Sequence, residues 1–417
     1  MPLHASAATS SIWSIFWIFL KLGLTSFGGP IAHLGYYRDE FVLRRRWLDD
    51  ARYADLVALC QFLPGPASTQ VGFSLGVLRA GGLAGGVAAW LGFTLPSALL
   101  MFGFALGATA LAGTPASGPG HDTMHGLGHG LGHGVVHGLK LVAVAVVAQA
   151  VWGMARTLTP DRQRIAIALS AMALVLLADG PGAQLAAIAG GGLAGYWLCR
   201  GPLAQTDAAL STPLGRRGAL VALALFALLL LGLPLLAGLA AYRPLALFDA
   251  FYRSGALVFG GGHVVLPLLQ AETVATGWVS NQAFLAGYGL AQALPGPLFA
   301  FAAFLGAQAG MTASAPGGAA LALLALFLPG LLLVAGALPF WDRMRRLASA
   351  RHAMMGANAA VVGILGAALY DPVWTSAIFD VRDLGVALAG FALLTVCKAP
   401  PWLVVILSAA AGVALDM

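Results

Sequence analysis

The chain is poor in charge: of its 417 residues only 9% are Asp, Glu, Lys or Arg, whereas 59% are hydrophobic. Soluble globular domains carry about 25% charged residues, so this composition excludes an ordinary soluble domain. The mean hydropathy of +0.86 and repeated apolar runs such as 218–241 instead indicate a polytopic membrane protein. Strand-like alternation of polar and apolar residues is absent, so α-helices are the expected spanning elements.

Motifs for enzymatic chemistry are also missing. There is no Gly-x-x-x-x-Gly-Lys-Ser/Thr loop for ATP and no Ser/His/Asp arrangement, so we expect neither an enzyme nor a cofactor. No Lys or Arg precedes the first apolar run, and we expect no removable signal peptide. The three cysteines, Cys60, Cys199 and Cys397, lie in or beside apolar segments and predict no disulfide framework. Energy for any transport would come from an ion gradient, the membrane potential or a partner.

Two short motifs occur twice, in the same order. Phe27-Gly28-Gly29 recurs as Phe259-Gly260-Gly261, and Pro64-Gly65-Pro66 recurs as Pro295-Gly296-Pro297. The alignment also pairs Lys21 with Arg253, Glu40 with Glu272, Gln61 with Gln292, and 93-FTLPSALL-100 with 326-LFLPGLLL-333. One extra span between two repeats inverts the second repeat. We therefore predict an all-α polytopic membrane protein with two inverted-topology repeats, at 1–205 and 248–417, joined by a linker with an unpaired transmembrane helix at 206–247.

The positions of the basic residues support this inversion. Loop 33–55 carries five Arg, whereas its partner 270–282 carries no Lys or Arg; loop 113–138 carries none, whereas 341–351 carries four. The positive-inside rule therefore predicts that 33–55 and 341–351 are cytoplasmic and that 270–282 is not. Counting every apolar run as a full span puts basic loops on the wrong side. Every basic loop becomes cytoplasmic if the first two segments of each half are re-entrant hairpins, broken at Phe-Gly-Gly and Pro-Gly-Pro.

These breaks predict a binding site. Irregular backbone at membrane depth is tolerated only where it is buried in protein or lines a wet cavity. A broken helix also leaves backbone N–H groups free and presents the positive end of its dipole. Two inverted copies bring such ends toward one place, which favours a site for an anion.

The run 20-LKLGLTSFGGPIAHLGYYRDEFV-42, followed by 61-QFLPGPAST-69 and weaker copies in the second half, resembles the chromate ion transporter family in its long, two-domain form. The resemblance covers nearly the whole chain. It implies a multi-pass inner-membrane carrier that exports chromate and so confers chromate resistance, with sulfate as a competitor. We expect alternating access at the interface of the repeats. The chain departs from the family pattern at Ala67, where relatives often carry Asn, and in the insert 113–138.

A divalent oxyanion needs N–H donors, hydroxyls and one or two cations to replace its hydration. Residues of these types that lie at or near the breaks are the candidate substrate-binding residues. They are Lys21, Thr25, Ser26, Gly28, Gly29, Gln61, Gly65, Ser68, Thr69, Arg253, Gly260, Gly261, Gln292 and Gly296. Each has an ordinary alternative: cations can snorkel to the interface, and hydroxyls and amides can satisfy broken backbone.

Other titratable residues give weaker signals. Glu40, Glu272, His33 and His263 are candidate proton-coupling groups, with ion pairing or packing as the alternatives. His121, His125, His129, His133 and His137 recur every four residues and on a helix would form one face able to bind a transition metal. Gly follows each of the last four and disfavours a helix, so we expect a loop with incidental metal affinity and no resident metal.

Chromate export is the favoured function, and two alternatives stay open. One is a transporter of sulfate or another anion, in either direction; the other is a non-transporting metal sensor that uses the His-rich segment. Expected partners are chromate, sulfate and the lipid bilayer, with no nucleic acid; a homodimer is left open. Deleting 121–137 would abolish a sensor and spare a carrier.

Overall fold

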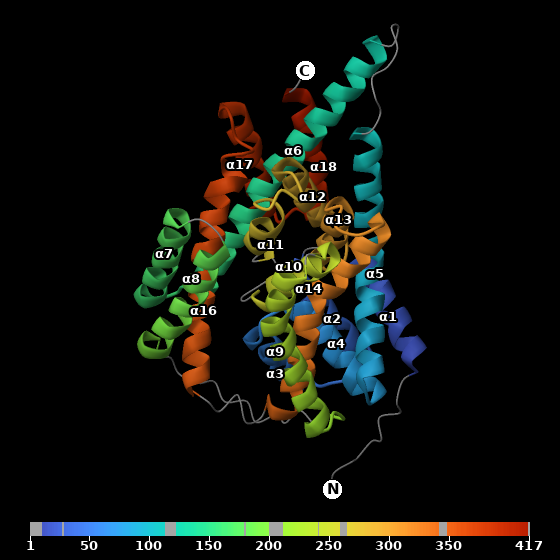
Figure 1. The fold of residues 1–417 in the computed structure, drawn as a ribbon, viewed down its shortest axis with the longest axis vertical. Helices are drawn as coiled ribbons and strands as arrows, with labels where there is room; N and C mark the ends of the chain where they lie inside the picture. Colours follow the sequence, from blue (N-terminus) through green and yellow to red (C-terminus); the bar gives the residue numbers. More distant parts are fainter. Residues whose placement is uncertain are drawn as a thin grey trace.

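The computed structural model describes residues 11–26, 29–112, 122–178, 181–199, 212–240, 242–258, 265–341 and 348–415 (Figure 1). These residues form helices joined by turns, and they include no strand. An apolar chain in a bilayer must satisfy its backbone groups internally, which helices do. The predicted all-α fold is confirmed.

The first half of the chain forms helices of very different lengths. They are α1 (Ile12–Thr25), α2 (Gly29–Arg38), the π-helical turn η1 (Asp39–Arg44), α3 (Asp50–Phe62), α4 (Ala67–Ala80), α5 (Leu83–Ala112), α6 (Asp122–Leu158), α7 (Arg162–Leu177) and α8 (Pro181–Leu198). The unpaired apolar run then forms α9 (Arg216–Leu239), which packs against the second half.

The second half repeats this order. Its elements are α10 (Arg243–Ala256), α11 (Val265–Thr273), α12 (Asn281–Ala293), η3 (Leu298–Ala300), α13 (Phe301–Gln308), α14 (Ala315–Ala337), η4 (Leu338–Phe340), α16 (Ala348–Ala368), η5 (Leu369–Trp374), α17 (Val381–Thr395) and α18 (Pro401–Leu415). Side-chain caps start several helices at polar positions, as Asp49 does for α3 and Ser280 for α12.

Equivalent helices run in opposite directions. In Figure 1, α5 rises along the long axis whereas its counterpart α14 descends, and α6 descends whereas α16 rises. Packing partners repeat as well, since α1 and α4 pack on α5, and α10 and α13 pack on α14. The halves also exchange partners: α6 packs against α17 and α18, and α16 packs against α7 and α8. The structure is therefore an inverted repeat whose halves are intertwined.

Helix length separates full spans from broken segments. Five helices in the described part of the chain are long and apolar enough to cross a membrane: Leu83–Gly107, Gly134–Arg156, Arg216–Leu239, Ala315–Phe340 and Arg351–Asp371. The α-helices beside the four breaks, α1 to α4 and α10 to α13, have only 8 to 14 residues. At 1.5 Å per residue they fall short of a hydrocarbon core of about 30 Å. The predicted broken helices are confirmed.

The His-rich segment differs from our expectation. Residues 122–137 belong to α6, so the prediction of a loop was wrong for them; His121 lies outside the described residues. The glycines have a packing role where α6 meets α18. A Cβ on Gly138 would lie 2.1 Å from the Ser408 carbonyl oxygen, so only glycine permits this approach. Close packing of the two helices outweighs the low helix propensity of glycine.

Candidate functional site

The helices break where the paired motifs predict. In the first half, α1 ends at Thr25 and α2 begins at Gly29, while α3 ends at Phe62 and α4 begins at Ala67. In the second half, the equivalent breaks separate α10 from α11 and α12 from η3. Leu63 is extended, with ψ 147°, because a residue before proline avoids the helical region. The proline therefore ends α3 at a fixed point.

Each Pro-Gly-Pro turn is hydrogen-bonded to the other half. The Gly65 N–H donates to the Val258 carbonyl at 2.7 Å, and the Gly296 N–H donates to the Ser26 carbonyl at 2.9 Å. Val258 and Ser26 each directly precede a Phe-Gly-Gly motif, so these two bonds join all four breaks. We call the pair of bonds the interlock. Because both N–H groups bond to carbonyls, neither is a free donor for an anion.

Both turns require glycine. Gly65 and Gly296 have φ angles of +121° and +96°, which residues with a Cβ rarely adopt. Space is lacking too: a Cβ on Gly65 would lie 3.0 Å from Cα of Gly330, and one on Gly296 would lie 2.8 Å from Oγ of Ser97. Gly330 and Ser97 follow the matched prolines inside α14 and α5. Each turn therefore rests on the long helix of the opposite half.

Beside the interlock, the first half buries a group of neutral polar side chains, which we call the polar cluster. Its members, each at most 3% exposed, are Ser26, His33, Ser68, Thr69, Gln70, Thr94 and Ser97. His33 Nδ1 lies 3.4 Å from Ser68 Oγ, and the Ser26 backbone is close to the same ring. Within the described part of the chain, five atoms of the cluster have no hydrogen-bond partner: Ser26 Oγ, His33 Nε2, Thr69 Oγ1, Gln70 Oε1 and Thr94 Oγ1. Buried polar atoms are normally paired, so such a concentration indicates a site for a polar ligand or water.

The first turn of α4 adds further donors. Ser68 and Thr69 lie in this turn, where backbone N–H groups lack intrahelical partners and the helix dipole is positive. Gln70 fixes the turn, because its Nε2 donates to the Pro64 carbonyl at 2.9 Å and to the Gly330 carbonyl at 3.0 Å. The polar cluster thus offers hydroxyls, an imidazole and a helix N-terminus. These groups suit an anion.

Several predicted residues lie outside the polar cluster. Lys21 and Thr25 are exposed on α1, and the Thr25 hydroxyl donates to the Lys21 carbonyl at 2.9 Å. Gln61 is exposed, whereas Gln292 is half-buried and its Nε2 has no partner in the described chain. Gly29 has a φ of +76° and open space beside it. Gly28, Gly260, Gly261 and His263 lie outside the described residues.

The cation of the second half is already paired. Arg253 Nη1 and Nη2 donate to the two carboxylate oxygens of Glu272 at 2.7 and 3.1 Å, and its Nε donates to Asp249 Oδ2 at 3.0 Å. Asp249 is not among the predicted site residues, although it lies one helical turn before Arg253 on α10. Arg253 is therefore held by two carboxylates and does not reach the polar cluster as a free cation.

Glu40 is also paired, and at a different place. It accepts hydrogen bonds from Arg44, the last residue of the π-helical turn η1, and from Arg45, which directly follows that turn. Burial alone would raise the pKa of Glu40, but the bonds and charges of the two arginines hold it below its usual range. Glu40 is therefore ion-paired, which was the alternative to a proton-coupling role.

The His-rich segment ends in a hydrogen bond to α17. His137 Nε2 lies 2.7 Å from Oδ1 of Asp383, which links α6 to α17. No group of three or more His, Cys, Asp or Glu side chains that could hold a metal ion occurs in the described part of the chain. His125, His129 and His133 follow the helical backbone of α6.

Three members of the polar cluster are not among the residues predicted from sequence. Thr94 and Ser97 lie in an apolar run, where an isolated polar residue is ambiguous in sequence, whereas Gln70 directly follows Ser68 and Thr69. A signal existed for Ser97, which directly follows the matched proline of 93–100, and for Gln70, which lies four residues after Pro66. The proximity of Thr94 and Ser97 to the breaks depends on packing between helices far apart in sequence.

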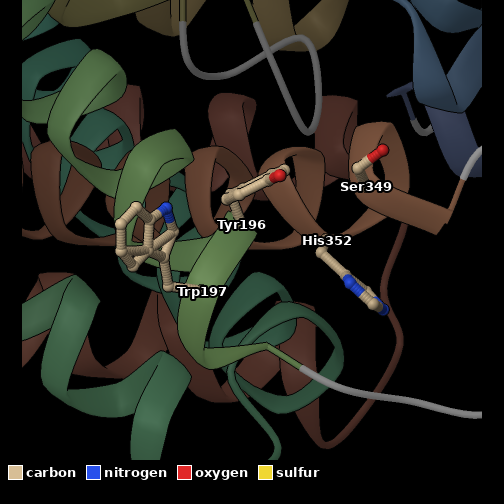
Figure 2. Close-up of a pocket in the computed structure, with 4 residues that line it drawn as sticks. All are labelled: Tyr196, Trp197, Ser349 and His352. Atoms are coloured by element: carbon tan, nitrogen blue, oxygen red, sulfur yellow. The ribbon is translucent and has the colours of Figure 1, made fainter.

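A separate pocket lies at the end of α8 and the start of α16. Figure 2 shows Tyr196, Trp197, Ser349 and His352 lining this pocket of about 510 Å³. None of these residues flanks one of the four helix breaks. The pocket is therefore distinct from the polar cluster.

Comparisons with known proteins agree on one family. The family model described as "Chromate transporter" matches residues 13–196 and 245–413. A chromate transport protein of Pseudomonas aeruginosa is 32% identical over 368 residues, which cover 85% of this chain and 79% of that protein. A probable chromate transport protein of Synechococcus elongatus is 28% identical over 412 residues, covering 95% of this chain and 93% of its own length. The chromate transport protein of Cupriavidus metallidurans is 26% identical over 396 residues, covering 93% and 89% respectively. No solved structure matches the chain.

Proposed function

The chain belongs to the chromate transporter family, and on that premise we propose that it exports chromate from the cytoplasm across the inner membrane. We propose the polar cluster as its oxyanion site and the interlocked breaks as the moving junction of an alternating-access cycle. Sulfate, with the same charge and nearly the same shape, is the expected competitor.

The observation that carries this proposal is the set of unpartnered polar atoms in the polar cluster. A tetrahedral dianion has four acceptor oxygens and loses its water on entering a buried site, so each oxygen needs a donor. Hydroxyls of Ser26, Thr69 and Thr94 and the His33 ring supply donors from several different segments. The N-terminus of α4 supplies partial positive charge.

The absence of a formal cation among the seven side chains of the polar cluster suits release as well as binding. A carrier must let its substrate go, and neutral donors hold an anion less tightly than a desolvated ion pair. The membrane potential then favours exit, since an inside-negative potential contributes about 2.3 kcal/mol per charge per 100 mV. A chromate dianion therefore leaves the cell electrically downhill.

The test is chromate uptake into inverted membrane vesicles, with sulfate as the competitor. Thr94→Ala on α5 and Thr69→Ala on α4 each remove one unpartnered hydroxyl, and a lost hydrogen bond to a charged ligand costs about 1.5–3 kcal/mol, or roughly 10- to 150-fold in affinity. Ser74→Ala is the matched control on α4, because the Ser74 hydroxyl already donates to the Gln70 carbonyl at 2.8 Å. We expect about a twofold change or less there.

Two outcomes would overturn the proposal. Unchanged chromate affinity in both Thr69→Ala and Thr94→Ala would move the site away from the polar cluster. Sulfate uptake without chromate uptake by the unaltered protein would favour the other-anion alternative.

A further inference from the structure

Two carboxylates share one guanidinium in the second half. The Asp249 and Glu272 side chains are only 7% and 14% exposed, and both bond to Arg253 at 2.7 to 3.1 Å. Asp249 Oδ1 is buried and has no hydrogen-bond partner in the described chain. We call these three residues the acid-Arg triad.

The charges of the triad do not balance. With both carboxylates ionised its net charge is −1, and no second cation lies within ion-pair distance among the described residues. The packed helix α14 has no ionisable residue. The other titratable groups on elements packed against α10 and α11 are Arg216 and Arg217 on α9, Arg243 and Tyr252 on α10, Tyr196 on α8, and Arg351 and His352 on α16.

We propose that the acid-Arg triad is a proton-binding site that couples transport to the proton gradient; this inference rests on the proposed transport function. One proton bound by the two carboxylates makes the triad neutral. Loss of the proton leaves a buried negative charge, which is stable only once water reaches it. Proton occupancy is therefore linked to the closed state, and proton release to a state open to water.

The position of the triad connects it to the breaks. Arg253 lies on α10 and Glu272 on α11, so their bidentate pair joins the two arms of the broken second-half hairpin. Leu257, one turn after Arg253, donates its N–H to the Arg253 carbonyl, and the next residue, Val258, accepts the Gly65 N–H of the interlock. A shift of α10 relative to α11 therefore moves an interlock acceptor. Protonation in the second half can change the junction beside the polar cluster of the first half.

The equivalent first-half positions do not form such a site. They are Trp17, Lys21 and Glu40, which supply one acid in place of two. Lys21 is exposed, and Glu40 bonds to Arg44 and Arg45. One proton site per chain is expected, and each cycle would take up one proton from the periplasmic side and release it to the cytoplasm as chromate leaves.

The experiment uses the purified full-length protein in proteoliposomes at clamped zero potential. Chromate counterflow measures exchange without a net proton movement, and an imposed pH gradient measures coupled accumulation. A trapped pH dye reports chromate-dependent proton flux. Asp249→Asn and Glu272→Gln each remove one negative charge, so the triad is neutral without a bound proton. We expect both to keep counterflow within about threefold and to lose at least tenfold of the accumulation driven by the pH gradient. Asp39→Asn, an exposed carboxylate in η1, is the control and should resemble the unaltered protein.

The outcomes separate the two proposals. Absence of chromate counterflow in the unaltered protein would overturn the proposed function itself. Counterflow without any chromate-dependent proton flux in the unaltered protein would overturn the triad proposal alone, whether or not the variants fold. The triad proposal also fails if a folded Asp249→Asn or Glu272→Gln protein still accumulates chromate in response to the pH gradient.

Discussion

The two Pro-Gly-Pro turns have the same backbone, whereas the polar cluster beside them comes from the first half alone. Gly65 and Gly296 share a positive φ, donate the same type of hydrogen bond and rest on equivalent points of α14 and α5. Ser68, Thr69 and Gln70 of the polar cluster follow the first turn, and Ser26 and Ser97 lie beside Gly296 of the second. The positions equivalent to the seven members of the cluster are apolar or glycine in the second half, and all are buried: Val258, Val265, Phe299, Ala300, Phe301, Phe327 and Gly330.

This difference assigns separate roles to repeated and unrepeated residues. Repeated residues such as the turn glycines and matched prolines determine where the helices break and how the two halves pack together. Unrepeated residues determine the chemistry, with neutral donors in the first half and two carboxylates on one guanidinium in the second. Substitutions of repeated residues should therefore have the same effect in both halves. Substitutions of unrepeated residues should have different effects in the two halves.

The largest effects are expected at the turn glycines. Gly65→Ala and Gly296→Ala force a Cβ into a strained backbone region and into contacts of 2.8 to 3.0 Å. We expect each to destabilise the protein by about 3 kcal/mol and to abolish chromate transport to the same extent. Thermal unfolding and vesicle uptake measure this. Gly103→Ala in α5, where a Cβ meets nothing within 4 Å, is the control. A large effect in only one half would break the equivalence of the turns.

The next effect concerns Arg253 and Lys21, the cations at equivalent positions of the two halves. Arg253→Met strands two carboxylates, and we expect a loss of stability of about 2 kcal/mol, below the roughly 3–5 kcal/mol of a fully buried pair, because the Arg253 side chain is 27% exposed. Lys21→Met, at the equivalent exposed position, should leave stability within about 0.5 kcal/mol. Fluorescence-detected size-exclusion after heating measures both. Partial recovery of the Arg253→Met protein by Glu272→Gln would show that the stranded charge is the cause. A folded Lys21→Met protein without transport would instead support Lys21 as a substrate ligand.

A smaller effect is expected when a polar-cluster residue takes the identity of its second-half counterpart. His33→Val copies Val265 and removes a ring nitrogen without a protein partner, so chromate affinity should fall about tenfold, or about 1.4 kcal/mol. The reciprocal Val265→His should lower stability without raising affinity, because its neighbours are apolar. Chromate binding to purified protein separates the two. Equal losses of affinity from both changes would contradict a one-sided site.

The framework of this protein, but only part of its candidate site, is predictable from the sequence. The duplicated motifs and the Arg-rich loops were sufficient for the inverted repeat and the broken helices, because both are local patterns. The pairing of Gly65 with Val258 was out of reach, since it depends on contacts between residues far apart in sequence. The place of Ser97 beside Gly296 depends on a contact of the same kind. The pairing of Arg253 with Asp249, by contrast, joins residues one helical turn apart, so the sequence did carry a signal for it.

The smallest effect concerns Glu40, the first-half counterpart of Glu272. Arg44 and Arg45 hold the pKa of Glu40 below its usual range despite burial, which acts in the opposite direction. A carboxyl with a lowered folded-state pKa stabilises the protein above its unfolded pKa of about 4.3, and this contribution disappears as the pH falls through the folded value. Glu40→Gln should therefore reduce stability by about 0.5 kcal/mol at neutral pH and by less as the pH falls through the acidic range. Thermal unfolding across this range measures the difference between the two proteins.

In contrast to Glu272→Gln, Glu40→Gln should leave the response of chromate accumulation to a pH gradient intact, because Glu40 bonds within one turn and joins no arms of a broken hairpin. Loss of that response in Glu40→Gln would place a coupling proton in the first half and remove the asymmetry between the halves.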